Sequence, residues 1–168
     1  MTGNKYIGLN GIDLQEIATI QTSAGAGDAG KILALNSSGL IDSTALPSSS
    51  AVTMTASESI SAGAIVNIWD SGGGVMKVRN ADNSAVGKQA DGFCIGAITS
   101  AATGPVNIGN GINTGVSGLT VGARYVLGSA GAVTVTAPTT SASILQKVGV
   151  ARSATELEVI IEVPIIRA

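Results

Sequence analysis

The sequence predicts an all-β protein, in which an extended N-terminal arm is followed by an antiparallel β-sandwich or barrel domain. Hydrophobic residues make up 45% of the 168 residues and aromatic residues only 2%, so the core must consist of Val, Ile, Leu and Ala rather than of rings. The 23 glycines often stand beside Asp, Asn and Ser, which is typical of turns. From Val52 onward, short apolar runs alternate with these turn residues at the spacing of an all-β domain, about 8 to 12 residues.

The strands expected in this C-terminal domain are short apolar or alternating runs bounded by turn residues, at 52–56, 65–69, 76–80, 92–98, 104–108, 124–127, 133–136, 145–151 and 156–163. The loops 70–74 and 128–132 have the composition of hairpin turns between antiparallel neighbours. In the last strand, alternation places one set of side chains toward a core, namely Leu157, Val159, Ile161 and Val163. The glutamates between them then face water or a neighbouring subunit.

The first 24 residues carry many apolar side chains for so short a segment. Asp13 and Glu16 are spaced as a capping box for one short helical turn, which would place Leu14 and Ile17 on one face. This apolar strip could pack on the chain's own C-terminal domain or dock on another protein. The Gly, Ala and Ser residues of 22–30 form a hinge that favours docking.

A connector follows the hinge and has the pattern of a small hairpin. Lys31–Leu35 has the length of one strand, Asn36–Gly39 is a turn and Leu40–Asp42 could be the returning strand. Because an isolated hairpin of this size is marginally stable in water, another surface should hold it. Pro47 and the serines after it predict a boundary between an N-terminal region, 1–50, and a β-domain, 51–168.

Several classes of function are disfavoured by composition. The chain has no histidine, the commonest general base and metal ligand. Its net charge of −2 provides no excess of positive charge for binding nucleic acid, and its apolar runs are too short to cross a membrane. No N-terminal signal peptide is expected, and the single Cys94, in an apolar run without basic neighbours, is expected in the core. We therefore expect no catalytic, cofactor or metal site and no enzymatic activity.

The remaining candidates for chemistry have simpler interpretations. Gly72–Gly74 lacks the following Lys-Ser/Thr and helix of a phosphate loop and indicates a hairpin turn. Asp82 and Asp91 lack the spacing of a calcium loop and are expected to be solvated. Trp69 and Tyr125 could bind sugars, but with so few rings in the chain we favour core packing or a subunit contact.

Two segments resemble parts of phage structural proteins. The run DAGKILALNSSGLIDSTALP at 28–47 resembles a connector near the N-termini of tailed-bacteriophage head-decoration and fibre proteins. The run GVSGLTVGARYVL at 115–127, followed by QKVGVA at 146–151 and ATEL at 154–157, is similar to a C-terminal β-module of the same class. Together these matches cover roughly half of the chain.

This resemblance implies a structural virion protein of the capsid decoration or head-fibre type. By this resemblance it would be a homotrimer that is assembled in the bacterial cytoplasm. Its N-terminal arm would bind the major capsid protein, while the β-domain would project from the capsid exterior. The candidate capsid-contact residues are the apolar side chains of the arm and connector, namely Tyr6, Ile7, Leu9, Ile12, Leu14, Ile17, Ile32, Leu33 and Leu35. The alternatives are a short tail-fibre or baseplate protein, whose β-domain would touch the host, and a carbohydrate-binding module; a host-surface glycan is a possible partner in either case.

Overall fold

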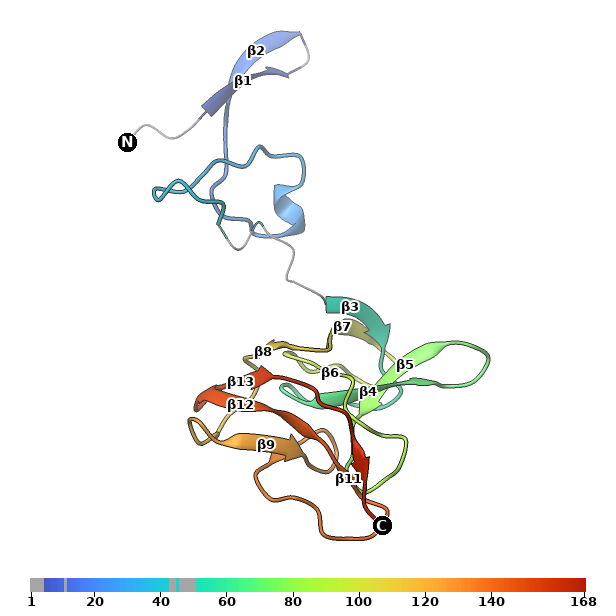
Figure 1. Ribbon diagram of the computed structural model, residues 1–168. Helices are drawn as coiled ribbons and strands as arrows, with labels where there is room; N and C mark the ends of the chain where they lie inside the picture. Colours follow the sequence, from blue (N-terminus) through green and yellow to red (C-terminus); the bar gives the residue numbers. More distant parts are fainter. Residues whose placement is uncertain (1–4, 11, 43–44, 46–50) are drawn as a thin grey trace. The chain divides into compact units, whose positions relative to one another are not determined.

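The computed structural model describes residues 5–10, 12–42, 45 and 51–168, and every named strand in it pairs antiparallel with its neighbours (Figure 1). The described residues contain no α-helix, only one 3₁₀ turn at Ala26–Asp28. The protein is therefore all-β, as the sequence predicts. By its internal contacts the chain divides into two compact units, residues 1–48 and 49–168.

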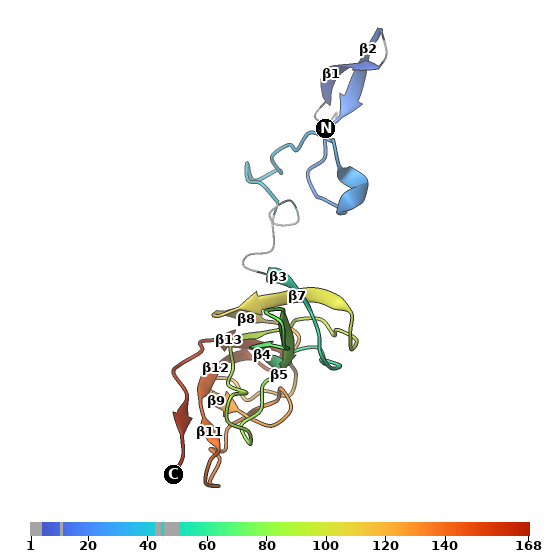
Figure 2. The same cartoon turned by 90° about the vertical axis from the view of Figure 1, so that its right-hand side faces the viewer.

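The first sheet of the C-terminal unit has the strand order β3-β7-β6-β4-β5. Its strands are β3 (Ala51–Thr55), β4 (Ile65–Asp70), β5 (Met76–Asn80), β6 (Gly92–Phe93) and β7 (Thr103–Ile108). Figure 2 shows β3 and β7 side by side. A parallel bridge between Ala56 and Val78 ties the chain after β3 to β5, so the sheet curls. A small apolar core lies against this sheet, made of Ala56, Ile60, Ala64, Val66, Val78, Cys94, Ile98 and Val106.

The second sheet has the order β10-β9-β12-β13-β8 and packs against the first. Its strands are β8 (Gly111–Asn113), β9 (Arg124–Leu127), β10 (Val133–Thr134), β12 (Lys147–Ser153) and β13 (Glu156–Val159); β11 (Ile144–Leu145) and β14 (Ile165–Ile166) form a separate pair. The larger core takes Ile65 and Phe93 from the first sheet and Leu127, Val148 and Leu157 from the second. This shared core makes the domain sandwich-like.

Four of the expected strands are shorter or interrupted, and the one expected at 133–136 ends at Thr134. The strand expected at 92–98 ends at Phe93, because the chain bends at 95–96, and Cys94 instead exchanges backbone hydrogen bonds with Gly63 and Ala64. The strand expected at 145–151 is broken at Gln146. The Gln146 amide bonds both backbone groups of Ala90, at 2.7 and 3.1 Å, and therefore takes the place of a neighbouring strand.

The last expected strand is correct in its first half only. Leu157 and Val159 are fully buried, and Ile161 packs half-buried against the larger core. Val163 is 86% exposed, so its assignment to the core is wrong. The alternating pattern continues in the sequence, but the regular strand β13 ends at Val159. Beyond it, only the Ile160 and Glu162 N–H groups still donate to β12, at the carbonyls of Val148 and Lys147.

In the N-terminal unit, β1 (Lys5–Asn10) and β2 (Asp13–Ala18) form a hairpin (Figure 1). The expected helical turn at 13–16 is wrong, because these residues lie within β2. The backbone groups of β2 pair with β1 over the whole strand, with Tyr6 opposite Ile17. Glu16 forms an ion pair with Lys5, at 2.7 Å, and this pair crosses the hairpin.

The connector keeps its predicted turn but forms no strands. Asn36 donates its backbone N–H to the Leu40 carbonyl, and its side-chain oxygen accepts from the backbone of Ser38 and Leu40. The segments 31–35 and 40–42 do not pair with each other; Leu33 instead forms an isolated parallel bridge with Ile20. The expected boundary at Pro47 and the following serines lies outside the described residues.

Candidate interaction surface

The N-terminal unit has no core of its own within its described residues, none of which is buried. The C-terminal unit, in contrast, contains both apolar cores. Large apolar side chains are instead exposed on the N-terminal unit, namely Ile7, Ile12, Leu14, Ile32, Leu33, Leu35, Leu40 and Ile41. Such a concentration of apolar surface is typical of a binding surface.

On one face of the β1–β2 hairpin, the side chains of the two strands pack against each other. Tyr6 and Ile17 are directly opposite each other and both are half-buried. They pack over Gly8: a Cβ atom at that position would lie 2.6 Å from Cδ1 of Ile17 and 3.3 Å from Cε2 of Tyr6. Gly8 thus lets the two side chains close over the strand.

The opposite face of the hairpin is open. Ile7 is 72% exposed and Leu14 is 75% exposed, and alternation along the strands separates both from Tyr6 and Ile17. Ile12, between the strands, is 95% exposed. The backbone of Leu9 pairs with that of Leu14, while the Leu9 side chain lies outside the described part of the chain. Ile7, Leu14 and Ile12 are the most exposed large apolar side chains described in this unit, and we call them the open hairpin face.

The three connector candidates lie on a segment held beside Ile20. The Ile20 N–H donates to the Ile32 carbonyl at 3.0 Å, and the Ala34 N–H donates to the Ile20 carbonyl at 2.8 Å. Ile32, Leu33 and Leu35 expose between 36% and 52% of their surface, so this segment too presents apolar side chains to solvent.

An ion pair fixes the turn that leads into this segment. Lys31 approaches Asp28 at 2.6 Å. The hydrogen bond from Lys31, and then that from the Ala24 backbone, lower the pKa of Asp28. The charged carboxylate therefore holds both ends of the turn.

Leu40 and Ile41 were not among the predicted contact residues, although both are exposed. The sequence signal for them was the apolar pair after the Asn36–Gly39 turn. This pair predicts a returning strand, whereas in the structure it forms no strand.

In the C-terminal unit, the two candidate calcium ligands have structural roles. Asp91 accepts hydrogen bonds from the Asn67 amide, at 2.8 Å, and from the Ile68 backbone, at 2.9 Å. Burial raises the pKa of Asp82, but hydrogen bonds from Ser84 and Ala130 outweigh this effect, and the net pKa is lowered. Asp82 therefore ties two loops together and Asp91 ties its segment to β4, so both are half-buried and not simply solvated as expected. Among the described residues no group of three or more potential ligands could hold a metal ion.

The cysteine and the aromatic candidates also have structural surroundings. Cys94 is fully buried, as predicted, and burial raises the pKa of its thiol to about 11. Tyr125 is part of the larger core, and its hydroxyl accepts a hydrogen bond from the Thr120 backbone. Trp69 is half-buried beneath the guanidinium of Arg79, 4.4 Å from the ring centre. Gly72–Gly74 lies in the predicted hairpin turn between β4 and β5.

No helix among the described residues is long and apolar enough to span a membrane.

No protein-family model matches the sequence, and no curated protein matches it significantly. The chain is similar in structure to the N base of the head fibre gp8.5 of bacteriophage phi29. The likeness has a TM-score of 0.44 and 13% sequence identity, and it covers 67% of this chain and 92% of the other.

Proposed function

We propose that this chain is a structural protein of a tailed-bacteriophage virion that attaches to the capsid exterior through residues 1–48 and projects residues 49–168. The observation that carries the proposal is the contrast between the two units. The first exposes large apolar side chains and has no buried residue in its described part, whereas the second has two apolar cores. The sequence resemblance of the connector and the β-module to phage structural proteins supplies the kind of partner.

The open hairpin face and the connector segment would supply the binding energy. Burying one Leu or Ile side chain contributes roughly 1.5–3 kcal/mol, so a few such residues are enough for a specific contact. The major capsid protein is the partner that we propose for this surface. A two-stranded hairpin is marginally stable alone, so the contact would also stabilise the hairpin itself.

A homotrimer would strengthen this attachment. Three N-terminal units joined to one assembly bind with a high effective concentration after the first contact, so modest contacts at each unit add up to slow release. The resemblance to trimeric phage proteins supports this part of the proposal.

The experiment is reconstitution on capsids that lack the protein. Purified full-length protein is mixed with these capsids, and the particles are imaged by cryo-electron microscopy. We expect ordered density at symmetry-related sites on the capsid, and none when residues 1–48 are deleted. A second measurement, sedimentation of the free protein, reports whether it is a trimer.

Three outcomes would contradict the proposal. Density at the tail alone would favour the tail-fibre or baseplate alternative. Full decoration by the shortened chain would show that the N-terminal unit is not the attachment site. Turnover of a polysaccharide by the purified protein would show an enzymatic role.

A further inference from the structure

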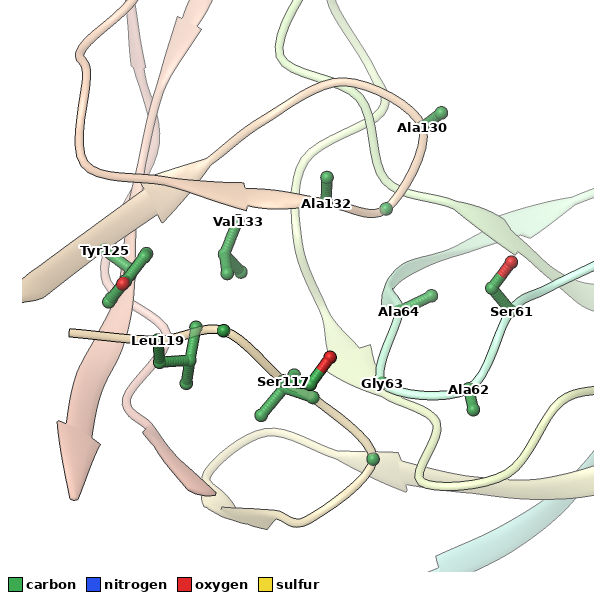
Figure 3. Close-up of a pocket in the computed structure, with 14 residues that line it drawn as sticks. Ser61, Ala62, Gly63, Ala64, Ser117, Leu119, Tyr125, Ala130, Ala132 and Val133 are labelled. Atoms are coloured by element: carbon green, nitrogen blue, oxygen red, sulfur yellow. The ribbon is translucent and has the colours of Figure 1, made fainter. Parts of the chain in front are cut away.

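A pocket of about 440 Å³ lies in the C-terminal unit, where three loops converge (Figure 3). Its walls are the segment before β4, at 61–64, the segment after β8, at 115–119, and the turn into β10, at 130–133. Tyr125 of β9 completes the lining. The volume falls within the roughly 300–1,000 Å³ that is typical of small-molecule sites.

Hydrogen bonds hold the first two walls together. Asn113, which is fully buried, donates its side-chain amide to the Gly63 carbonyl at 2.9 Å and accepts from the Gly115 N–H at 3.0 Å. Gly63 also donates its own N–H to the Cys94 carbonyl. The relative position of the two walls is therefore set before any ligand binds.

The third wall is fixed in the same way. The Ile65 N–H donates to the Gly131 carbonyl at 2.8 Å, and the Gly131 N–H donates to the Ala81 carbonyl at 2.7 Å. Thr120, next to the second wall, donates to the Tyr125 hydroxyl at 2.9 Å. A preformed pocket loses little conformational entropy when it binds a ligand.

Glycine is required where the first two walls meet. A Cβ atom on Gly63 would collide with the Gly115 carbonyl, and one on Gly115 would collide with the Ile95 carbonyl. Gly63 also has a φ of 76°, which side chains other than glycine rarely adopt. The two walls therefore pack backbone against backbone here, with no room for a side chain between them.

The residues that line the pocket are uncharged, and they differ between its two ends. Figure 3 shows Leu119, Tyr125 and Val133 toward one end of the pocket and Ser61 and Ala64 toward the other. No charged side chain lines the pocket, so a bound ion would lose its hydration without compensation. Within the described contacts, the hydroxyls of Ser61 and Ser117 form no hydrogen bond with the protein and can bond a ligand.

We propose that this pocket binds a neutral saccharide. A sugar ring carries hydroxyls that suit the free serines and an apolar C–H face that suits Leu119, Tyr125 and Val133. The floor of the pocket is buried at Gly63, Leu119 and Tyr125, while Ser61 and Ser117 at its rim are exposed. An open rim accommodates a ring that belongs to a longer chain. The site is separate from the N-terminal contact surface and does not depend on capsid attachment.

The test is nuclear magnetic resonance of the full-length protein with ¹⁵N-labelled backbone amides. The probes are glucose, galactose, N-acetylglucosamine and N-acetylgalactosamine, with galacturonic acid as the charged counterpart. We expect at least one neutral sugar to shift the amide signals of 61–64, 115–119 and 130–133. Galacturonic acid should bind more weakly than galactose, because nothing in the lining compensates its charge.

Variants of two exposed serines separate the pocket from the rest of the surface. Ser117→Phe should fill the pocket and lower the sugar affinity by about tenfold or more. Ser117→Ala should lower it by roughly two- to tenfold, the usual net effect of one hydrogen bond. Ser141→Phe and Ser141→Ala are the controls, because Ser141 is exposed and lies outside the lining. The unperturbed part of each spectrum verifies that the variant is folded.

Three results would overturn the proposal. The first is the absence of shifts with every neutral probe, and the second is a set of shifts outside the pocket that Ser117→Phe leaves unchanged. The third is a change in sedimentation with Ser117→Phe and no sugar binding, which would make the pocket a contact between copies of the chain. Capsid attachment of Ser117→Phe should equal that of the unaltered protein, so the two proposals fail independently.

Discussion

At the scale of single residues, Cys94 shows how burial sets chemical behaviour. Its thiol is fully buried and burial raises its pKa to about 11. Because the thiolate is the reactive form, we expect Cys94 of the folded protein to resist 5,5′-dithiobis(2-nitrobenzoic acid) at pH 8 and to react fully in guanidinium chloride. Equal reaction rates in the two conditions would contradict the burial of this side chain.

The same pKa predicts a pH dependence of stability. A folded-state pKa raised above the unfolded value of 9.0 favours the native state below pH 9. This contribution is lost as the pH rises from 9 toward 11, because the unfolded chain releases its proton first. Cys94→Ala should remove this component of the alkaline loss of stability, as measured by urea titrations across that range.

The burial of Cys94 could be predicted from its apolar run, because a local pattern is enough to mark a core segment. The roles of Asp91 and Gln146 could not. Asp91 is bonded to Asn67, which is 24 residues away, and Gln146 to Ala90, which is 56 residues away. Only tertiary structure brings these partners together.

At the scale of elements, the hairpin of the N-terminal unit has one packed and one open face. Ile7→Ser and Leu14→Ser, alone and combined, should weaken capsid binding by about tenfold or more for each side chain, because each removes apolar area from the proposed contact. Binding is measured by co-sedimentation with capsids over a range of protein concentrations. Neither change should alter the thermal unfolding of the C-terminal unit.

The matched control for these variants is Val163→Ser. Val163 is 86% exposed, as open to solvent as the hairpin residues, but it belongs to the C-terminal unit. Capsid binding should be unchanged by it. An equal loss of binding with Val163→Ser would mean that attachment uses the C-terminal unit.

Elements with a strong local pattern were predictable. The strands β5 and β9 have the bounds that the sequence predicts, and the first half of the 156–163 alternation is correct. The β1–β2 hairpin was missed, although Asn10-Gly11 after an apolar run is a hairpin signal. The spacing of Asp13 and Glu16 pointed to a helix instead, and the pairing of β2 with β1 outweighed that local preference.

At the scale of the whole molecule, the two units should differ in their ability to fold alone. Residues 49–168 contain both cores, and we expect this fragment to unfold in one cooperative transition. Residues 1–48 have no buried residue in their described part, and we expect that fragment to show no cooperative transition. Circular dichroism during heating of each fragment is the measurement. Cooperative unfolding of 1–48 as a monomer would contradict its need for a partner.

The position of Trp69, the ring beneath Arg79, has a practical consequence for such experiments. Trp69 is the only tryptophan of the chain and lies in the C-terminal unit, while the single ring of residues 1–48 is Tyr6. Indole fluorescence therefore follows the fate of residues 49–168 alone, without any added label. Because the N-terminal unit contains no tryptophan, its unfolding does not contribute to this signal.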